Sequence, residues 1–218
     1  LVAASLRADG QNPAVVRGTI GADPLGALAI NGSVPALLPK LYDEMAATSC
    51  WCEIHMPELR NILVSGQPYS DGGASAVQEL GYMLATAIVY LREMQERGLS
   101  IEQEAGRMQF SFSLGANFFM EIAKLRAARL LWSQIIESFG GSKEARKMAI
   151  HARTATFNKT KYDPYVNMLR TTTEAFSAVI GGIDSLQVSP FDECLQIPDE
   201  FSRRIARNTQ IILQSECN

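Results

Sequence analysis

The feature that most limits how this chain can fold is a regular alternation of short strand-like runs with longer helical patterns. In the two longest helical patterns, residues 74–97 and 117–138, apolar residues recur every three or four positions and form a core-facing stripe. The strand-like runs are residues 15–20, 61–66, 108–113, 148–154 and 182–189. Strands joined by helices of this length need crossover connections, so they pair in parallel. The sequence therefore predicts an α/β protein with about five β/α units.

Local sequence signals mark where several helices should begin. Ser100 and Gln103 have the residue types and spacing of a capping box, in which each side chain bonds the other residue's backbone. A capping residue directly before a proline also predicts a first helical turn. The pairs of this second kind are Asp163-Pro164 and Ser189-Pro190.

Polar residues at alternate positions of the expected strands help to choose between two architectures. A doubly wound sheet buries both faces under apolar side chains, whereas a β/α barrel can enclose something polar. The residues that share a polar face are Ser65 with Gln67, then Gln109, Ser111 and Ser113, then His151 and Arg153, then Ser185, Gln187 and Ser189. Edge strands with one solvated face would give the same pattern, and that alternative stays open. A complete barrel needs eight strands in roughly 250 residues, so residues 1–218 are expected to be part of one TIM-type (β/α) barrel domain.

Charge and composition exclude several classes of protein. The chain has 20 Lys plus Arg against 23 Asp plus Glu, which lacks the basic excess of a nucleic-acid-binding protein. No stretch reaches the roughly 20 apolar residues of a membrane span, and the first ten residues do not resemble a signal peptide. The expected location is therefore intracellular, in the cytoplasm or another compartment. The chain opens on Leu without an initiator Met, and we expect it to be cut from something longer.

Generic catalytic and cofactor motifs are missing from the sequence. There is no GxGxxG after a strand and no GxxxxGK[ST], so nucleotide binding is not expected. His55 and His151 are the two histidines, which leaves little for a Ser-His-Asp or metal-centred mechanism. The four cysteines show no metal-ligand spacing, and we expect them to be reduced thiols.

Three long segments carry a resemblance to a known family. They read GANFFMEIAKLRAARLLW (115–132), HARTATFNKTKYDPYVNMLRTTTEAFSAVIGGIDSLQVSPFDE (151–193) and RRIARNTQIIL (203–213). These segments resemble the signature segments of the methylmalonyl-CoA mutase family of cobalamin-dependent acyl-CoA mutases. Weaker similarity extends back through residues 65–82 to residues 17–26, so the resemblance covers nearly the whole chain.

The resemblance implies a barrel that threads acyl-CoA along its axis and holds adenosylcobalamin against the C-terminal ends of its strands. The cofactor supplies radical chemistry that interconverts methylmalonyl-CoA and succinyl-CoA, while the protein supplies position, charge and exclusion of water. The polar strand residues then become candidate substrate-binding positions. These candidates are Ser111, Ser113, His151, Arg153 and Gln187.

Where the family carries its catalytic groups, this chain departs from the pattern. The family's Tyr-His pair, which assists cofactor homolysis and contacts the thioester carbonyl, is here Gln67 and Pro68. The family's Gln after the first strand is Gly21, and its carboxylate-binding Arg is Asn31. Two further ligand-facing positions, a Gln and a His in the family, are here Arg153 and Gln187. No residue of this chain is therefore expected to be catalytic.

Loss of the ligand-facing groups with retention of the packing motifs resembles the small, non-catalytic subunit of a heterodimeric mutase. The resemblance implies a catalytic large mutase subunit as partner, and an isolated chain that is inactive and self-associates through unpaired strand edges. The family's Asp-x-His-x-x-Gly cobalamin motif is absent, so adenosylcobalamin is expected to act through the complex and not to bind this chain alone. Two alternatives stay open: an active acyl-CoA mutase with altered acyl specificity, and an acyl-CoA binding module.

A group of basic residues suggests a further candidate site. Placed at a barrel mouth, these residues could meet the phosphates of CoA. The simpler interpretation is a solvated helix start and loop, and it is the one that we favour. The residues are Lys143, Arg146, Lys147, Arg153, Lys159 and Lys161.

Overall fold

The structure is a computed structural model that describes residues 2–217. The chain packs as two compact units, each assembled from three stretches of sequence. The first unit consists of Leu1–Ser65, Leu84–Phe110 and Trp132–Met148, and the second of Gly66–Met83, Ser111–Leu131 and Ala149–Asn218. Each unit has a buried apolar cluster of its own.

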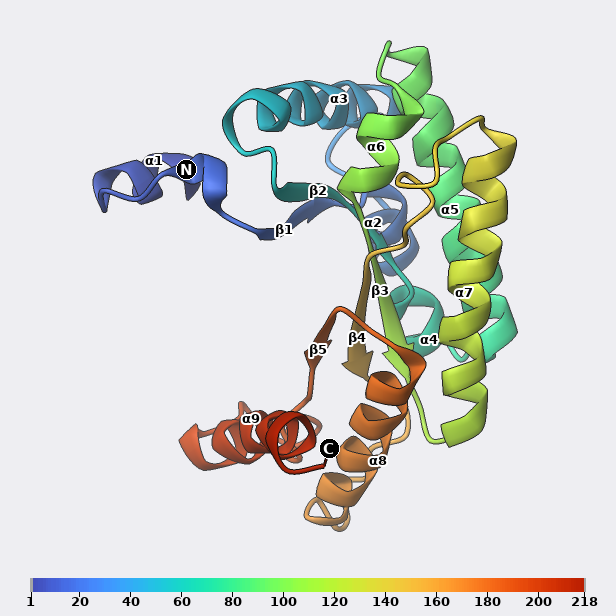
Figure 1. Ribbon diagram of the computed structural model, residues 1–218. Helices are drawn as coiled ribbons and strands as arrows, with labels where there is room; N and C mark the ends of the chain where they lie inside the picture. The colour runs from blue at the N-terminus through green and yellow to red at the C-terminus, as the bar shows by residue number, and fades with distance from the viewer. Residues whose placement is uncertain (1, 218) are drawn as a thin grey trace. The chain divides into compact units, whose positions relative to one another are not determined.

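Five strands pair in the order in which they occur along the chain. They are β1 (Gly18–Ala22), β2 (Leu59–Ser65), β3 (Met108–Leu114), β4 (Ile150–Thr154) and β5 (Ser185–Gln187). The sheet order is β1-β2-β3-β4-β5, and the pairs β1–β2 and β4–β5 are parallel. Helices separate the strands (Figure 1), and each predicted run overlaps an observed strand. The predicted α/β class with five β/α units is confirmed.

The connecting elements are helices of seven to 21 residues with two shorter turns. In chain order they are α1 (Val2–Ala8), the 3-10 helix η1 (Pro13–Val15), α2 (Pro24–Asn31), α3 (Leu38–His55), α4 (Gln67–Asp71), α5 (Ala76–Glu96), α6 (Ile101–Arg107), α7 (Phe118–Ser138), α8 (Val166–Gly181) and α9 (Glu200–Ser215). Among the described residues, no helix combines the length and the apolar character needed to cross a bilayer.

The capping box predicted before α6 is confirmed. The Ser100 hydroxyl accepts a hydrogen bond from the Gln103 backbone N–H, and the Gln103 side chain accepts one from the Ser100 backbone N–H. At the start of α9, the Asp199 carboxylate accepts from the Ser202 N–H in the same way. Both helices therefore begin where a side chain satisfies a backbone donor that the helix leaves unpaired.

The two helix starts predicted from prolines are wrong. Pro164 begins a tight turn in which its carbonyl accepts from the N–H of Asn167, and α8 starts two residues later, after Tyr165. Pro190 also begins a turn, closed by the N–H of Glu193, and no helix follows until Asp199. A proline fixes the first backbone angle of a turn as readily as that of a helix, so the dipeptide alone does not distinguish them.

Large aromatic side chains form the centre of the first unit. Trp132 of α7 and Phe110 of β3 are fully buried, and their rings meet edge to face with centroids 4.8 Å apart. Tyr90 of α5 is also fully buried. Together with Ile62 and Val64 of β2, these residues anchor the helices against the strands by removing apolar area from water.

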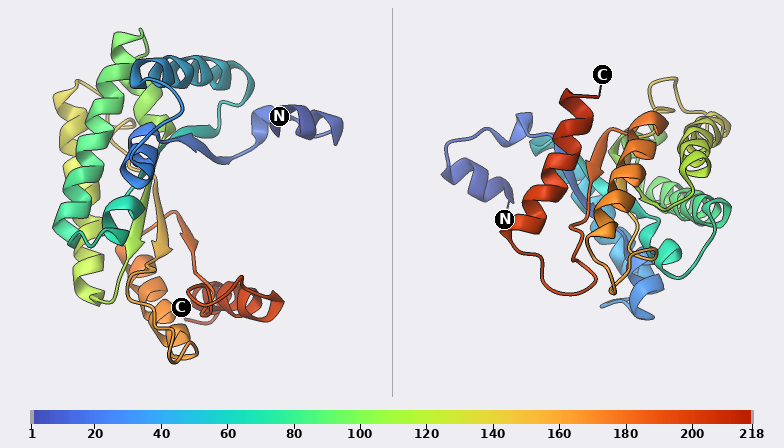
Figure 2. Two further views of the ribbon diagram at one scale, coloured as in Figure 1. Left: turned by 180° about the vertical axis from the view of Figure 1, so that it is seen from behind. Right: turned by 90° about the horizontal axis from the view of Figure 1, so that it is seen from below.

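Small residues allow close helix packing in the second unit. Ala175 of α8, Val188 after β5 and Ala206 of α9 form one buried cluster, and α8 and α9 lie side by side (Figure 2). At the end of α8, a Cβ on Gly181 would lie 2.4 Å from the Leu125 side chain of α7. Only glycine therefore fits this contact between α7 and α8.

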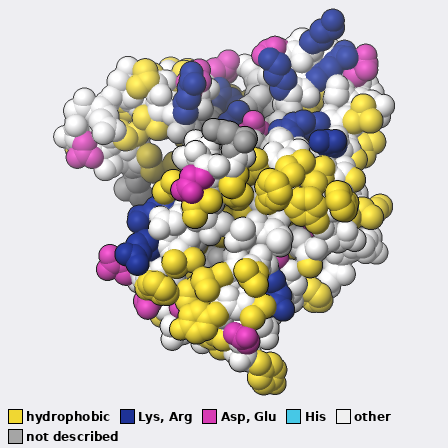
Figure 3. Space-filling view, turned by 60° about the horizontal axis from the view of Figure 1, so that its bottom comes forward, with side chains coloured by type: hydrophobic (Ala, Val, Ile, Leu, Met, Phe, Trp, Pro, Cys, Tyr) yellow, Lys and Arg dark blue, Asp and Glu magenta, His cyan; other side chains and the backbone are white. Residues whose placement is uncertain are grey.

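Hydrophobic side chains gather in broad patches on the face shown in Figure 3. On α8, Leu169, Phe176 and Ile180 remain 69%, 42% and 39% exposed. Their spacing of seven and four residues places them on one side of the helix. Exposed apolar area of this kind is typical of surfaces that contact another chain.

The two helical glycines of the second unit should respond oppositely to an added methyl group. We expect Gly181→Ala to lower the free energy of unfolding by about 1–3 kcal/mol, because the new Cβ would overlap the buried Leu125. Gly81→Ala in α5 is the control, since nothing lies within 4 Å of its Cβ position. It should raise stability by about 0.5–1 kcal/mol through helix propensity. Urea unfolding followed by circular dichroism measures both, and equal effects would contradict the packing assignment.

Candidate functional site

Gln67 and Pro68, the positions predicted to correspond to the family's Tyr-His pair, lie in the first turn of α4. Strand β2 ends at Ser65, Gly66 caps the turn, and Gln67 and Pro68 are the first residues of the helix. The prediction that Gln67 shares a strand face with Ser65 is therefore wrong, because the chain has already left the sheet. Pro68 occupies a first-turn position, where its missing N–H has no helical partner to lose. It offers no group that could contact a thioester.

Gly66 brings this turn against a buried carboxylate. Its N–H donates to the Ser111 carbonyl of β3 at 2.9 Å. A Cβ at this position would lie 2.4 Å from Glu79 Oε1 and 2.6 Å from Met83 Sδ. The close approach is possible only without a side chain, so glycine here lets the start of α4 and the start of α5 sit beside the end of β3.

A buried ion network fixes the C-terminal end of β3. The Lys124 ammonium group of α7 lies 2.6 Å from Glu79 Oε2, 2.6 Å from the Ser113 carbonyl oxygen and 2.5 Å from Glu121 Oε2. The second oxygen of Glu79 accepts from the Ser113 N–H at 2.8 Å, and that of Glu121 accepts from the Gly115 N–H at 3.2 Å. The ammonium group therefore donates two hydrogen bonds and neutralises a second carboxylate through the ion pair with Glu121. Burial raises the pKa of Glu79, and the positive charge of Lys124 opposes the rise.

The same network forms part of the wall of a cavity of about 250 Å³ in the second unit, lined by both polar and apolar groups. Its lining residues come from α4 and the turn after it, from the starts of α5 and α7, and from the segments at the ends of β3 and β4. They are Ser70, Gly73, Ala74, Ala76, Glu79, Ser113, Gly115, Ala116, Glu121, Ala155, Phe157 and Asn158. The candidate Ser113 is thus placed at a cavity, but it is 95% buried and its backbone is held by the ion network.

Two candidate residues pair with β5 across the β4–β5 ladder. His151 lies opposite Ser185, and Arg153 lies opposite Gln187. His151 Nδ1 is 2.8 Å from the Ser185 hydroxyl. Burial and the nearby charge of Arg153 lower the pKa of His151, so the imidazole is neutral at pH 7. Gln187 is exposed.

Arg153 is engaged within the chain. Its Nη2 donates to Glu193 Oε1 at 2.8 Å, and both side chains are partly buried. The backbone N–H of Ser189 donates to the Thr154 hydroxyl, which joins the segment after β5 to the end of β4. The guanidinium group therefore neutralises a carboxylate of its own chain, and it is the one permanently charged group among the five candidates.

Asn167 joins the loops that follow β4 and β5. Its side chain is fully buried, accepts from the Thr160 N–H and donates to the carbonyls of Thr160 and Phe191. Beside it, the buried Lys159 ammonium lies 2.6 Å from Glu174 Oε2. These contacts hold the two loops in place, although neither loop has regular secondary structure. The loop after β5 also carries Glu193, the partner of Arg153.

The two histidines have different surroundings. His151 Nδ1 is occupied by Ser185, and the ring of His55 lies against Trp51 with centroids 4.7 Å apart at the end of α3. Within residues 2–217, no three His, Cys, Asp or Glu side chains form a group that could hold a metal ion.

In the first unit, Gly21, the position predicted to correspond to the family's Gln, has no room for a side chain. A Cβ on Gly21 of β1 would lie 2.5 Å from Leu63 Cβ and 2.7 Å from the Leu63 backbone nitrogen of β2. The β1–β2 register shifts between Thr19 and Ala22, which flank this position. A longer side chain at position 21 would therefore force the paired strand to move. Asn31, the position of the family's Arg, is exposed at the end of α2.

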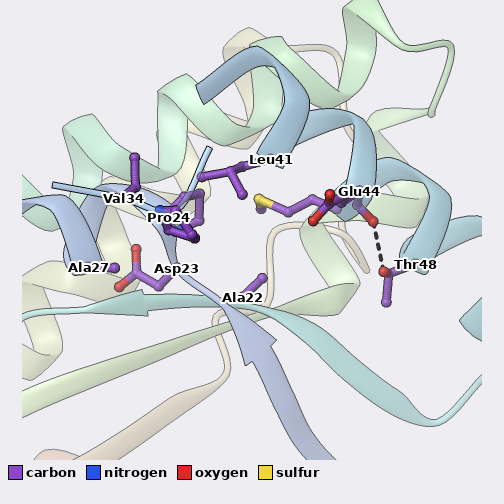
Figure 4. A pocket seen from close by; sticks show the side chains of 10 residues that line it. Ala22, Asp23, Pro24, Ala27, Val34, Leu41, Glu44 and Thr48 are labelled. Atoms are coloured by element: carbon purple, nitrogen blue, oxygen red, sulfur yellow. Dashed lines mark hydrogen bonds between the residues drawn. The ribbon is translucent and has the colours of Figure 1, made fainter. Parts of the chain in front are cut away.

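Directly after β1, Asp23 ties together four elements of the first unit. Its carboxylate accepts from the Tyr90 hydroxyl at 2.6 Å, the Gly26 N–H at 2.9 Å and the Ser65 N–H at 3.0 Å. Burial raises the pKa of Asp23, and these three donors oppose the rise. The carboxylate also borders a mostly apolar pocket of about 320 Å³ between α2 and α3 (Figure 4). Because its hydrogen bonds hold the start of α2, we assign Asp23 a structural role.

The basic residues proposed to meet CoA phosphates are mostly paired. Arg146 contacts Glu137, Lys147 contacts Glu144, and Lys159 contacts the buried Glu174. Arg153, as described above, holds Glu193. The favoured interpretation, ordinary helix and loop residues, agrees with these contacts, since paired charges offer little attraction to a phosphate.

Sequence reasoning missed the buried ion network. Glu121 and Lys124 are three residues apart inside the strongest family segment, and Glu79 stands beside the apolar positions of its helix. Charged residues next to a core-facing stripe are the signal that could have revealed them. Their mutual contacts depend on how α5 and α7 meet β3, which periodicity does not specify.

Comparison with known proteins decides the family. The profile described as methylmalonyl-CoA mutase matches residues 1–218, the whole chain. The chain belongs to the methylmalonyl-CoA mutase family. The methylmalonyl-CoA mutase small subunits of Streptomyces virginiae and Porphyromonas gingivalis are 44% identical over 201 residues and 42% identical over 212 residues. These matches cover 92% and 96% of this chain and 32% and 34% of the two relatives.

Other members of the methylmalonyl-CoA mutase family match over a shorter range. The mitochondrial methylmalonyl-CoA mutase of Homo sapiens is 44% identical over 164 residues, which is 74% of this chain and 22% of that protein. The chain spans about a third of the length of the small subunits it matches. The resemblance inferred from the signature segments is thereby confirmed at the level of the family.

Removing the Lys124 ammonium group should leave two buried carboxylates without a neighbouring positive charge. We expect Lys124→Met to lower the free energy of unfolding by about 3–5 kcal/mol, because Glu79 and Glu121 would lose their cation in a dry interior. Lys147→Met is the control, since its ion pair with Glu144 is exposed and should contribute no more than about 0.5 kcal/mol. Urea unfolding compares the two. Similar losses in both variants would contradict the role given to the network.

Proposed function

We propose that this chain is five consecutive β/α units of the TIM-type barrel of a small, non-catalytic subunit of a methylmalonyl-CoA mutase. The polar strand faces and the sheet order support the barrel. The names of the two small-subunit relatives support the choice of subunit. The observation that carries the non-catalytic role is the state of the catalytic positions, where Gly21 is closed by Leu63 and Pro68 forms a helical turn.

The reaction that we propose for the whole complex is the interconversion of methylmalonyl-CoA and succinyl-CoA. A catalytic large mutase subunit would perform it, and adenosylcobalamin would be held there or by another region. In this proposal the present chain supplies scaffold and contact surface. Ser111, Ser113, His151, Arg153 and Gln187 line the side of the sheet along which acyl-CoA would pass, without taking part in chemistry.

An active mutase with altered acyl specificity is the main competing function. It would require Arg153 or Gln67 to bind the acyl group in place of the missing side chains. The ion pair of Arg153 with Glu193 speaks against this, because freeing the guanidinium would leave a partly buried carboxylate without its cation. A binding module for acyl-CoA would bind the same thioester without turnover.

The first test asks which subunit performs the chemistry. In a purified complex with a catalytic large subunit, we expect Pro68→Ala in this chain to leave turnover of methylmalonyl-CoA within about twofold of the original, since nothing in the reaction depends on it. Replacing the Tyr-His pair of the large subunit should abolish turnover. The isolated chain, supplied with adenosylcobalamin and methylmalonyl-CoA, should show none. Turnover that survives loss of the large subunit's pair, or that falls with Pro68→Ala, would reject the proposal.

The second test concerns association. We propose that the isolated chain self-associates, at least to a dimer, through apolar helix faces such as the Leu169, Phe176 and Ile180 side of α8. Leu169→Lys should weaken this association, because it would bury a charge at the contact. Val15→Lys is a control of matched exposure, 68% against 69%, in the first unit. Sedimentation velocity measures both, and a clean monomer of the unmodified chain at high concentration would refute the proposal.

A further inference from the structure

A buried polar cluster in the first unit lies apart from every position considered for the mutase reaction. It consists of Ser49 of α3, Asn61 of β2 and Glu104 of α6, which are 0%, 2% and 0% exposed. These residues come from three elements that meet just before β3 begins, since α6 ends at Arg107 and β3 starts at the next residue.

The hydrogen bonds of this cluster are one donor short. The Asn61 amide nitrogen donates to the Ser49 hydroxyl at 2.8 Å, and that hydroxyl donates to Glu104 Oε2 at 3.2 Å. Two oxygens remain without a partner, Glu104 Oε1 and Asn61 Oδ1, and both are buried from solvent. Both are acceptors while the carboxyl is ionised, so neither can satisfy the other. A buried acceptor left unpaired destabilises the fold.

A single proton on the carboxyl would remove the deficit. Protonated, Glu104 becomes a donor as well as an acceptor, and the amide oxygen of Asn61, which shares the Ser49 hydroxyl with it, is a buried acceptor that lacks a donor. The same proton removes a negative charge from an interior position.

The charges around Glu104 do not cancel the effect of burial on its pKa. Burial raises the pKa of Glu104 to about 7. The Ser49 hydrogen bond and the charge of Arg107 lower it, and the charge of Glu53 on α3 raises it. Arg107 is itself directed to the Leu59 carbonyl at 3.4 Å. Arg60 precedes Asn61 on β2 and so projects from the opposite face of the strand.

We propose that Glu104 carries a proton in the folded chain and acts as a pH-sensitive lock on the junction of α3, β2 and α6. The proton supplies the donor that Asn61 Oδ1 lacks, and its loss leaves a charge and an unpaired acceptor inside the junction. The lock does not depend on the proposed mutase role, because it involves no ligand-facing residue.

The direction of the pH dependence follows from the two states of the carboxyl. In the unfolded chain Glu104 has its ordinary pKa of 4.5, and in the folded chain about 7. The folded state therefore holds more protons between these values. The stabilisation is fully present below pH 4.5 and is lost as the pH rises to about 7.

Urea unfolding across about pH 5 to about pH 8 tests the lock with two variants on the same helix. Between pH 5 and pH 7 the folding equilibrium constant of the unmodified chain should fall by up to about tenfold per pH unit relative to that of Glu104→Gln, which is neutral throughout and keeps an N–H donor. Glu102→Gln is the control. Hydrogen bonds from Ser142 lower the pKa of exposed Glu102, so this variant should keep the original pH dependence. Parallel curves for the unmodified chain and Glu104→Gln would overturn the proposal.

A second measurement does not depend on the variants' stability. Infrared spectra at about pH 6 should contain the C=O band of a protonated carboxyl in the unmodified chain and in Glu102→Gln, and the band should vanish as the pH is raised through about 7. The band should be absent from Glu104→Gln. If no such band is seen at about pH 6, or if it persists in Glu104→Gln, the assignment of the proton to Glu104 is wrong.

Discussion

The ammonium group of Lys124 is the contact on which the second unit depends. It stands where α5, α7 and the end of β3 meet, where it donates hydrogen bonds to Glu79 and to the Ser113 carbonyl and forms an ion pair with Glu121. Each of the two carboxylates that it holds also accepts a backbone N–H, from Ser113 and from Gly115. In a dry interior such an arrangement is stable only when every partner is present, so the network specifies one geometry for the strand end.

The parts of the fold that follow from local pattern could be predicted from the sequence. Strands and helices alternate as the apolar periodicity indicated, and the Ser100 box starts α6 because its bonds lie within four residues. A turn and a helix can begin with the same residue types. Pro164 and Pro190 therefore predicted helix starts at positions where the structure has turns. Gln67 was predicted to lie on a strand, but β2 ends at Ser65 and the chain turns at Gly66. Alternation of polar and apolar residues does not reveal such a turn.

The candidate site could be located from the sequence but not described. The resemblance predicts which positions face a ligand, and the side chains present there can be read from the sequence. Their partners cannot, because Glu193 lies 40 residues from Arg153 and Ser185 lies 34 from His151. Such contacts arise only when the chain has folded, and they change what each group can do: one end of the Arg153 guanidinium is paired with a carboxylate, and burial beside Arg153 lowers the pKa of His151.

The contact between Gly21 and Leu63 has a consequence for how this lineage can change. Restoring the family's glutamine would place atoms into the backbone of the neighbouring strand, so the reversion alone would disturb β1–β2 pairing before any catalytic benefit appeared. A glutamine at position 21 would therefore be accommodated only together with a compensating change in β2.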